Sequence, residues 1–549
     1  ARPVTATATP APPAPAAAAG GHTGSLTATG GLTRFTLRRD RVRIAVWVVS
    51  IALLVVTTAA SVDGLFPTQA DLDEAAASVH GNAAAIVFNG PDQALDTRGG
   101  QIAFQLGTFG MVVVALMSIF TLGRATRGDE EAGRLDLVRS LPVGPHAPTA
   151  AALLVVVGMN VVVGTVVALG MLAQDLPTAG SLLFGAGFTA VGLVFAGVTL
   201  VAAQVTENTR VVYGASGVVL GAAFVLRAAG DVGDGTLSWL SPIGWAQKAR
   251  PYAGDRWWPL LVPLVAAAVL VAVAGRLAAH RDVGAGLVPS RPGPPHAAPA
   301  LGSPPGLALH LQRGALVAWA VGLLTLGVAY GSVADDIDDF VADNDSIRDV
   351  VAQTTGVSLT DSYLATSLLM LALIVAGFAV SSALRLRSEE TATHAEWILA
   401  GPVSRVRWAA SHLAVALAGS AVVMASTGLG VGLSYGLAAG DLGQVPRLVA
   451  ASLAYVPALW ALVGVTLVLF GLVPRATSVA WAALALCWVV GLLGTVFDFP
   501  AWVDDASPFQ HVPQVPAVDP EALPLVATLA VAAGLLVVGL AGFRRRDVG

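Results

Sequence analysis

Twelve runs of about 20 apolar residues follow one another along the chain, and they limit its fold more than any other feature. A helix needs roughly 20 apolar residues to cross the hydrocarbon core of a bilayer. Only 12% of the residues are charged and 55% are hydrophobic, whereas soluble domains carry about 25% charged residues. We therefore predict an all-α polytopic membrane protein, which excludes soluble, nucleic-acid-binding and disordered classes for the chain as a whole. The predicted spans lie near residues 43–62, 101–123, 149–172, 178–204, 211–229, 258–278, 314–333, 362–384, 408–436, 447–473, 478–498 and 524–543.

Basic residues are distributed unevenly between the two sides of this bundle. An even number of spans places both termini on one side of the membrane. That side carries 23 of the 30 Lys and Arg residues, but only 11 of the 35 Asp and Glu residues. Because cytoplasmic loops are enriched in Lys and Arg, we expect a multi-pass protein of a bacterial cell membrane with both termini in the cytoplasm.

The two halves of the chain carry matching segments in the same order. RGDEEAGRLDLVRSLPV at 127–143 follows the second span, and RSEETATHAEWILAGPV at 387–403 follows the eighth, without gaps at an offset of 260. Two tetrapeptides also occur once in each half. GVTL lies at 197–200 and 464–467, and RDVG lies at 281–284 and 546–549. Matches in register indicate two tandem six-span repeats. Because six is even, the repeats share one orientation, which favours a pathway between the halves.

Two segments have a composition that differs from the spans. The N-terminus is rich in Ala, Pro and Thr, and residues 288–306 are rich in Pro and Gly. Such compositions are typical of disordered tails and linkers. The predicted organisation is a disordered cytoplasmic tail at 1–30, a first half at 31–284, a cytoplasmic linker at 285–308 and a second half at 309–549.

The matching segments after the second and eighth spans are the most informative polar parts of the chain. Each begins with acidic residues, continues with a helix-compatible stretch and ends at Pro142 or Pro402. Acids in a first turn complement the helix dipole, and a proline ends a helix. A short helix at the membrane face suits docking of a soluble partner, although a solvated loop capped by its own charges is the alternative. The candidate docking residues are Asp129, Glu130, Glu131, Arg134, Leu135, Asp136, Val138, Arg139, Glu389, Glu390, His394, Glu396, Trp397 and Ile398.

Several kinds of chemistry have no sequence signature here. There is no G-x-x-x-x-G-K-[ST] motif for ATP, no His or Cys spacing suited to a metal, and no catalytic motif. No charged residue lies well inside a predicted span, and Arg227 lies near an outer end. Since ion-coupled transporters typically need ionisable groups in the membrane, a self-powered transporter is disfavoured. For the polar Gln105, Asn160 and Tyr363 we expect hydrogen bonds between helices.

The stretch RGDEEAGRLDLVRSLPVG, together with the two six-span halves, resembles the permeases of ABC exporters related to tetronasin resistance. These are identified as exporters of polyketide antibiotics in the ABC type-two permease superfamily. The resemblance implies a separate ATPase, bound as two copies, that carries ATP and Mg²⁺, with no cofactor on this chain. It also implies that the loops at 129–142 and 389–402 are coupling helices. The second copy replaces Arg134 and Arg139 by His394 and Leu399, which predicts unequal docking.

The same resemblance implies a substrate cavity lined by the second and fifth spans of each half. Core packing or contact with lipid is the alternative for each candidate. With the polar residues added, the candidates are Phe104, Gln105, Phe109, Met117, Phe224, Tyr363, Met370, Trp481 and Trp488.

The leading hypothesis is a permease that exports hydrophobic or amphipathic compounds, such as antibiotics, drugs or lipids, using ATP hydrolysed by its partner. One rival is a polytopic glycosyltransferase with a lipid-linked donor, in which Asp71 or Asp73 of the first outer loop is the catalytic acid. The absence of that pattern from the second half argues against this rival. A proton-coupled exporter is the third hypothesis. The acidic segment 335–349 lacks EF-hand spacing, so we expect a solvated outer surface there rather than a Ca²⁺ site.

Overall fold

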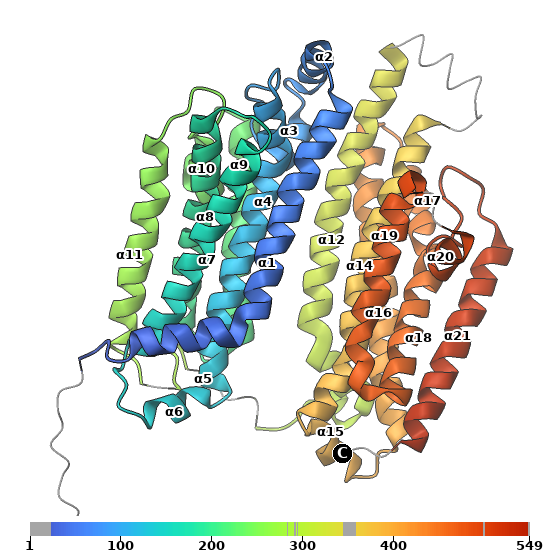
Figure 1. Cartoon of the computed structure of the whole chain (residues 1–549). Coiled ribbons are helices and arrows are strands. Elements are labelled where there is room, and N and C mark those ends of the chain that lie inside the picture. The colour runs from blue at the N-terminus through green and yellow to red at the C-terminus, as the bar shows by residue number, and fades with distance from the viewer. Residues whose placement is uncertain are drawn as a thin grey trace, which may run out of the picture. The chain divides into compact units, whose positions relative to one another are not determined.

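The computed structural model describes residues 24–282, 284–289, 293, 295–343, 358–497 and 500–546. Within these residues the chain is helical and contains no β-strand (Figure 1). Twelve helical segments of the described chain are long and apolar enough to cross a membrane. The predicted all-α polytopic class is confirmed.

The chain divides into two compact units, Ala1–Pro292 and Gly293–Gly549. The division falls inside the Pro/Gly-rich segment 285–308. Each unit contains six of the twelve long segments, and each is described by itself below.

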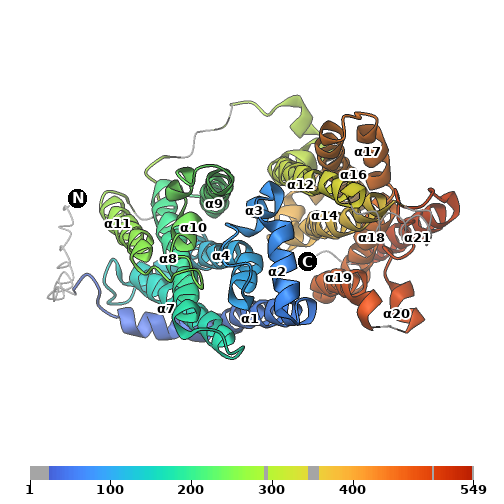
Figure 2. The ribbon, with the colours of Figure 1, turned by 90° about the horizontal axis from the view of Figure 1, so that it is seen from above.

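Unit 1 places its fourth span at the centre of the bundle. This helix, α8, packs against α4, α7, α9 and α11 (Figure 2). The spans of unit 1 are α1 (Thr29–Leu65), α4 (Arg98–Gly123), α7 (Ala147–Leu172), α8 (Thr178–Val205), α9 (Thr209–Val232) and α11 (Leu261–Ala278). Shorter elements connect them: α2 (Gln69–Val79), α3 (Ala83–Asn89), η1 (Arg124–Gly128), α5 (Asp129–Glu131), α6 (Arg134–Arg139), η2 (Leu237–Leu240), α10 (Pro242–Gln247) and η3 (Trp258–Leu260).

In unit 2 the fourth span includes α18, which packs against α14, α16, α19 and α21. Its elements are η4 (Pro299–Gly302), α12 (Pro304–Asp343), α14 (Leu359–Thr391), α15 (His394–Leu399), α16 (Arg405–Ala438), α17 (Gln444–Leu453), α18 (Val456–Leu472), η5 (Pro474–Val479), α19 (Ala480–Phe497), α20 (Ala501–Ala506) and α21 (Ala522–Arg545). The tenth predicted span is interrupted between α17 and α18, just before Pro457. A proline cannot donate the backbone hydrogen bond that would continue a helix.

Helix α1 begins earlier than the first predicted span. Figure 1 shows its first part lying across the lower end of unit 1 before the helix turns up along the bundle. Phe35 and Leu37 are exposed on this first part, among arginines. Apolar and basic side chains together are typical of a helix at a membrane interface. Residues 24–28, which belong to the predicted tail, lie beside the segment after α6, because Gly144 and His146 donate backbone hydrogen bonds to Thr27 and Ser25.

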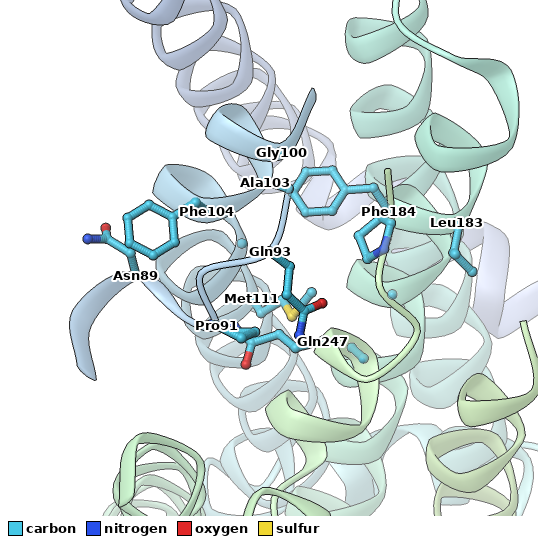
Figure 3. A pocket seen from close by; sticks show the side chains of 14 residues that line it. Asn89, Pro91, Gln93, Gly100, Ala103, Phe104, Met111, Leu183, Phe184 and Gln247 are labelled. Atoms are coloured by element: carbon cyan, nitrogen blue, oxygen red, sulfur yellow. The ribbon is translucent and has the colours of Figure 1, made fainter. Parts of the chain in front are cut away.

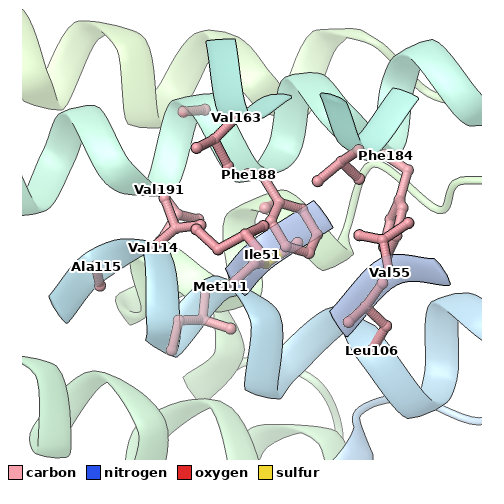
Figure 4. Packing of buried hydrophobic residues seen from close by; sticks show 14 of the residues in the cluster. Ile51, Val55, Leu106, Met111, Val114, Ala115, Val163, Phe184, Phe188 and Val191 are labelled. Carbon is pink, nitrogen blue, oxygen red and sulfur yellow. The ribbon is translucent and has the colours of Figure 1, made fainter. Parts of the chain in front are cut away.

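The core of unit 1 lies where α1, α4, α7 and α8 meet. Figure 4 shows Ile51, Val114, Val163 and Phe188 in contact there. Asn160 of α7 joins this core by polar contacts, since its amide donates to Ser118 Oγ on α4 at 3.0 Å and its backbone carbonyl accepts from a threonine on α8. Helices in lipid gain stability from such hydrogen bonds, and the role expected for Asn160 is confirmed.

Small residues bring α7 and α8 into backbone contact. A Cβ added at Gly185 would lie 2.2 Å from the carbonyl oxygen of Gly164. In unit 2, α16 and α12 are also in backbone contact at a glycine. A Cβ at Gly430 of α16 would lie 2.2 Å from the carbonyl oxygen of Leu324 in α12. Close packing of this kind drives helix association where both helix and lipid are apolar.

We predict that Gly185→Ala lowers the stability of the purified protein. The added methyl group has no space against α7, and overpacking costs roughly 1–3 kcal/mol. The measurement is thermal unfolding in detergent. The matched control is Gly217→Ala in α9, where a Cβ would meet nothing within 4 Å. Equal melting temperatures for the two variants would contradict the prediction.

Candidate functional site

A short helix follows the second span of each unit, as the sequence predicts. In unit 1 the chain leaves α4 through η1 and α5, turns, and forms α6; in unit 2, α14 is followed directly by α15. Figure 1 shows α6 and α15 at the lower end of their units, which is the predicted cytoplasmic end. Both helices have six residues and start at positions 260 apart.

Glu130 is the centre of an ion-pair cluster rather than an exposed docking residue. Its carboxylate lies 3.1 Å from a guanidinium nitrogen of Arg127 and accepts two hydrogen bonds from Arg281, at 3.0 and 3.1 Å. The backbone N–H of Gly284 also donates to it at 2.7 Å. The side chains of Arg127 and Glu130 are 1% and 6% exposed. We call Arg127, Glu130 and Arg281 the unit 1 clasp.

The unit 1 clasp connects three spans. Arg127, at the end of the second span, donates to the backbone carbonyl of Ala203 at 2.7 and 3.1 Å. Arg281, just beyond the sixth span, donates through Nε to Oε1 of Gln204 at 2.8 Å. Ala203 and Gln204 belong to the last turn of α8. The loop that carries α6 is therefore fixed to the fourth and sixth spans of its own unit.

Unit 2 contains an equivalent clasp. Arg387 donates to Glu390 at 2.9 Å, and Arg546 donates to the other carboxylate oxygen. Arg546 also donates to the backbone carbonyl of Phe470 at 3.2 Å. Phe470 and Ala203 are equivalent, because each lies six residues after the first residue of its GVTL segment. The clasps explain two sequence matches at once: the Arg-x-x-Glu after the second span and the arginine of each RDVG.

Other acidic candidates are also engaged in local contacts. Asp129 accepts from Arg39 of α1 at 2.7 Å and from Arg134 at 2.8 Å. Glu131 accepts from the backbone N–H of Thr209 at the start of α9. Its position at the helix N-terminus suits a carboxylate. In unit 2, Glu389 lies 2.5 Å from Arg385 and 3.1 Å from His394.

Each short helix carries one large apolar side chain that is strongly exposed. Leu137 of α6 is 74% exposed and Trp397 of α15 is 84% exposed. These two residues are equivalent at the offset of 260. By contrast, Val138 and Ile398, at the next position, are partly buried. Among the other docking candidates, Arg134, Asp136, Arg139 and Glu396 are exposed and Leu135 is partly buried.

The turn before each short helix requires a left-handed backbone. Gly133 has φ +69° and the equivalent Thr393 has φ +60°. Only glycine adopts this conformation without steric cost from a Cβ. The second half therefore keeps the turn although it has lost the glycine.

The candidate substrate-lining residues fall into distinct environments. Met117 is fully buried in the core of unit 1, whereas Phe109 and Trp481 are exposed on their units. Tyr363 donates to the carbonyl of Tyr330 at 3.1 Å, as expected of a bond between helices. Gln105, Phe224, Met370 and Trp488 are partly buried. Their assignment to a cavity stays a prediction.

Phe104 borders a cavity of about 40 Å³ between α4, α8 and α10. Figure 3 shows Phe104, Met111, Phe184 and Gln247 around it. Ligand pockets for drug-sized molecules have volumes of about 300–1,000 Å³. The cavity holds a few water molecules at most and is too small for a drug.

From the sequence we expect Arg227 near the outer end of a span and assign it no role. It lies in α9 with a fully buried side chain and donates to the backbone carbonyls of Ile86 and Val87 in α3. Asp231 lies 3.5 Å away, one turn along α9. The arginine thus caps the C-terminal end of α3 and fixes the predicted outer loop. In the sequence, only the i, i+4 spacing of Arg227 and Asp231 indicates that these two residues form an ion pair.

We predict that Glu130→Ala destabilises the protein by roughly 3–5 kcal/mol, the usual cost of removing one partner of a buried ion pair. The change leaves Arg127 and Arg281 without their shared carboxylate. Thermal unfolding of the purified chain measures the effect. Asp136→Ala is the control, because this carboxylate is exposed on α6. Equal stability of the two variants would refute a structural role for the clasp.

We predict that Thr393→Gly stabilises unit 2. Removing the Cβ relieves a left-handed conformation that costs a non-glycine residue roughly 1–2 kcal/mol. The reciprocal change, Gly133→Thr, should destabilise unit 1 by a similar amount. Melting temperatures that shift in opposite directions support this interpretation, and shifts in the same direction contradict it.

Comparison with known proteins identifies the family of this chain. Residues 301–544 match the family model described as the C-terminal domain of multidrug efflux system permease Rv1217c. The chain is 44% identical over 531 residues to the multidrug efflux system permease protein Rv1217c of Mycobacterium tuberculosis, with 96% of each chain covered. The chain therefore belongs to the family of multidrug efflux permeases that includes Rv1217c.

Proposed function

We propose that this chain is the membrane subunit of an ATP-driven exporter of hydrophobic or amphipathic compounds. The name of the M. tuberculosis relative supports efflux of drugs. The sequence contains no P-loop, so ATP hydrolysis requires a separate subunit. That partner is an ABC ATPase, present as two copies in line with the two six-span units. ATP and Mg²⁺ are bound by the partner.

The observation that carries this proposal is the pair of exposed apolar residues, Leu137 and Trp397. A single exposed apolar side chain is ordinary, but these two recur at equivalent positions on the short helices outside the spans, and we interpret that recurrence as a binding surface. Tryptophan is enriched among residues that dominate binding energy. Each residue fits an apolar depression on one ATPase copy. Since the two side chains differ in size, the two copies dock unequally.

The clasps provide a route from docking to the spans. A displacement of α6 acts on the clasp at Glu130, and through Arg127 and Arg281 on the ends of the second, fourth and sixth spans. The clasp at Glu390 does the same for unit 2. ATP binding to the partner then shifts the populations of two conformations of the permease. The substrate is taken from the cytoplasmic side and released outside.

The geometry around Asp71 does not favour the glycosyltransferase. Asp71 is the third residue of α2 and accepts hydrogen bonds from the side chain and backbone of Thr68 in a capping box. These bonds hold the pKa of Asp71 below its ordinary value. A catalytic acid needs a raised pKa. Asp73 accepts a hydrogen bond from Gln69 on the same helix. Both carboxylates therefore form hydrogen bonds that stabilise helix α2.

We predict that combining Leu137→Ser with Trp397→Ser weakens binding of the ATPase by at least roughly tenfold, because two apolar anchors are lost. The measurement is affinity of the purified permease in nanodiscs for a candidate ABC ATPase from the same gene neighbourhood, together with ATP turnover. The two single variants should differ, with Trp397→Ser the more severe.

Trp502→Ser is the matched control for this experiment. Trp502 is 74% exposed on α20, another six-residue helix, on the predicted outer side. Loss of binding in both tryptophan variants would overturn the docking assignment. Failure of the unaltered permease to bind any such ATPase would overturn ATP-driven export itself.

A further inference from the structure

A pocket of about 340 Å³ lies at the predicted cytoplasmic end of unit 1. Its walls are the first part of α1, the loop from η1 to α6 and the beginning of α7. The apolar side chains on its walls include Leu32 and Phe35 from α1 and Leu135, Leu137 and Val138 from α6. Leu137 is 74% exposed and therefore lies at the rim. The volume falls in the range of small-molecule sites.

The pocket also carries more positive than negative charge. Five arginines line it, against two carboxylates, Asp129 and Glu130. Glu130 belongs to the clasp, and Asp129 is paired with Arg39 and Arg134. Arg139 has no acidic partner within the described residues; its guanidinium makes only a 3.4 Å contact with a backbone carbonyl.

We propose that this pocket binds an anionic phospholipid from the adjacent leaflet. The phosphate lies between Arg134 and Arg139, which are both exposed at the mouth, and the first carbons of an acyl chain lie along Leu32 and Phe35. A basic pocket beside an interfacial helix is the arrangement that attracts anionic headgroups. Charge complementarity and the apolar wall on α1 together favour a lipid over a soluble anion.

The proposal assigns the lipid to unit 1 alone. At the equivalent positions of unit 2, Leu311, His394 and Leu399 replace Arg39, Arg134 and Arg139; Leu311 follows from the match of Trp47 with Trp319. Unit 2 therefore lacks these three cations. The arginine that it gains, Arg385 at the position of Ala125, is paired with Glu389 at 2.5 Å. The lipid would occupy the space between the interfacial part of α1 and α6, which are already linked by the ion pairs of Asp129 with Arg39 and Arg134. The inference rests on the lining of the pocket and not on the ATPase, although Leu137 belongs to both proposed sites.

The experiment compares phosphatidylglycerol with phosphatidylcholine as probes. The full chain is reconstituted in nanodiscs containing both lipids, released into mild detergent and analysed by native mass spectrometry for retained lipid. We expect one phosphatidylglycerol per chain to be retained preferentially. The double variant Arg134→Ala with Arg139→Ala should reduce its affinity roughly 10- to 30-fold, the effect of two arginines next to an anionic headgroup.

A second variant separates a defined pocket from general surface charge. Thr149→Trp fills the pocket from α7 while keeping every charge, and it should abolish the preferential retention as well. The matched control is Arg544→Ala with Arg545→Ala, which removes two exposed arginines at the same end of unit 2. Inorganic phosphate at millimolar concentration should not displace the lipid.

Each remaining outcome overturns the proposal in a distinct way. If both arginine double variants lost the preferential retention of phosphatidylglycerol equally, anionic lipid would be attracted only by the general basic charge of the surface. Retention unaffected by Thr149→Trp would mean that the pocket is not the site. Displacement by free phosphate would assign the cations to a soluble anion. Thermal unfolding of every variant confirms that the fold is intact.

Discussion

The contact between a buried glutamate and two arginines is the interaction on which the predicted cytoplasmic end of each unit depends. Glu130 with Arg127 and Arg281, and Glu390 with Arg387 and Arg546, connect the loop after one span to the ends of others. Removing such charges from water is costly unless every member is paired. Each clasp pairs its charges and adds a backbone carbonyl as a further acceptor, although Nη1 of Arg127 and Nε of Arg546 are buried without a hydrogen-bond partner among the described residues. The short helices α6 and α15 therefore start from fixed positions.

The two units use one plan with different chemistry. Asp129 pairs with Arg134, which follows it in the chain, whereas the equivalent Glu389 pairs with Arg385, which precedes it, and lies 3.1 Å from His394. Asp40 of α1 pairs with Arg124, whereas the equivalent Gln312 accepts a hydrogen bond from Ser382. These replacements are the basis on which we propose unequal docking and a lipid site in unit 1.

The packing between the helices follows from the fact that lipid surrounds the spans. Apolar side chains gain little by leaving lipid for a protein core, so helices associate through close backbone approach and a few hydrogen bonds. Gly164 with Gly185 and Asn160 with Ser118 are examples of each. The buried Arg227 lies near one end of α9, where it caps α3. The packing in the middle of the described spans combines small residues and apolar side chains with neutral polar groups such as Asn160 and Ser118 that hydrogen-bond to each other.

The sequence by itself determined the number of spans, the short helices after the second and eighth spans and the role of Asn160, because these follow from local hydropathy and helix signals. It also showed that RDVG recurs, but not why. Only the tertiary structure decided that Glu130 and Glu390 are buried in clasps, that Leu137 and Trp397 are the exposed members of their helices, and that Arg39, Arg134 and Arg139 line one pocket. Those facts depend on contacts between residues about 100 to 150 positions apart, such as Glu130 and Arg281. No local pattern encodes such contacts, because they arise only when the spans pack.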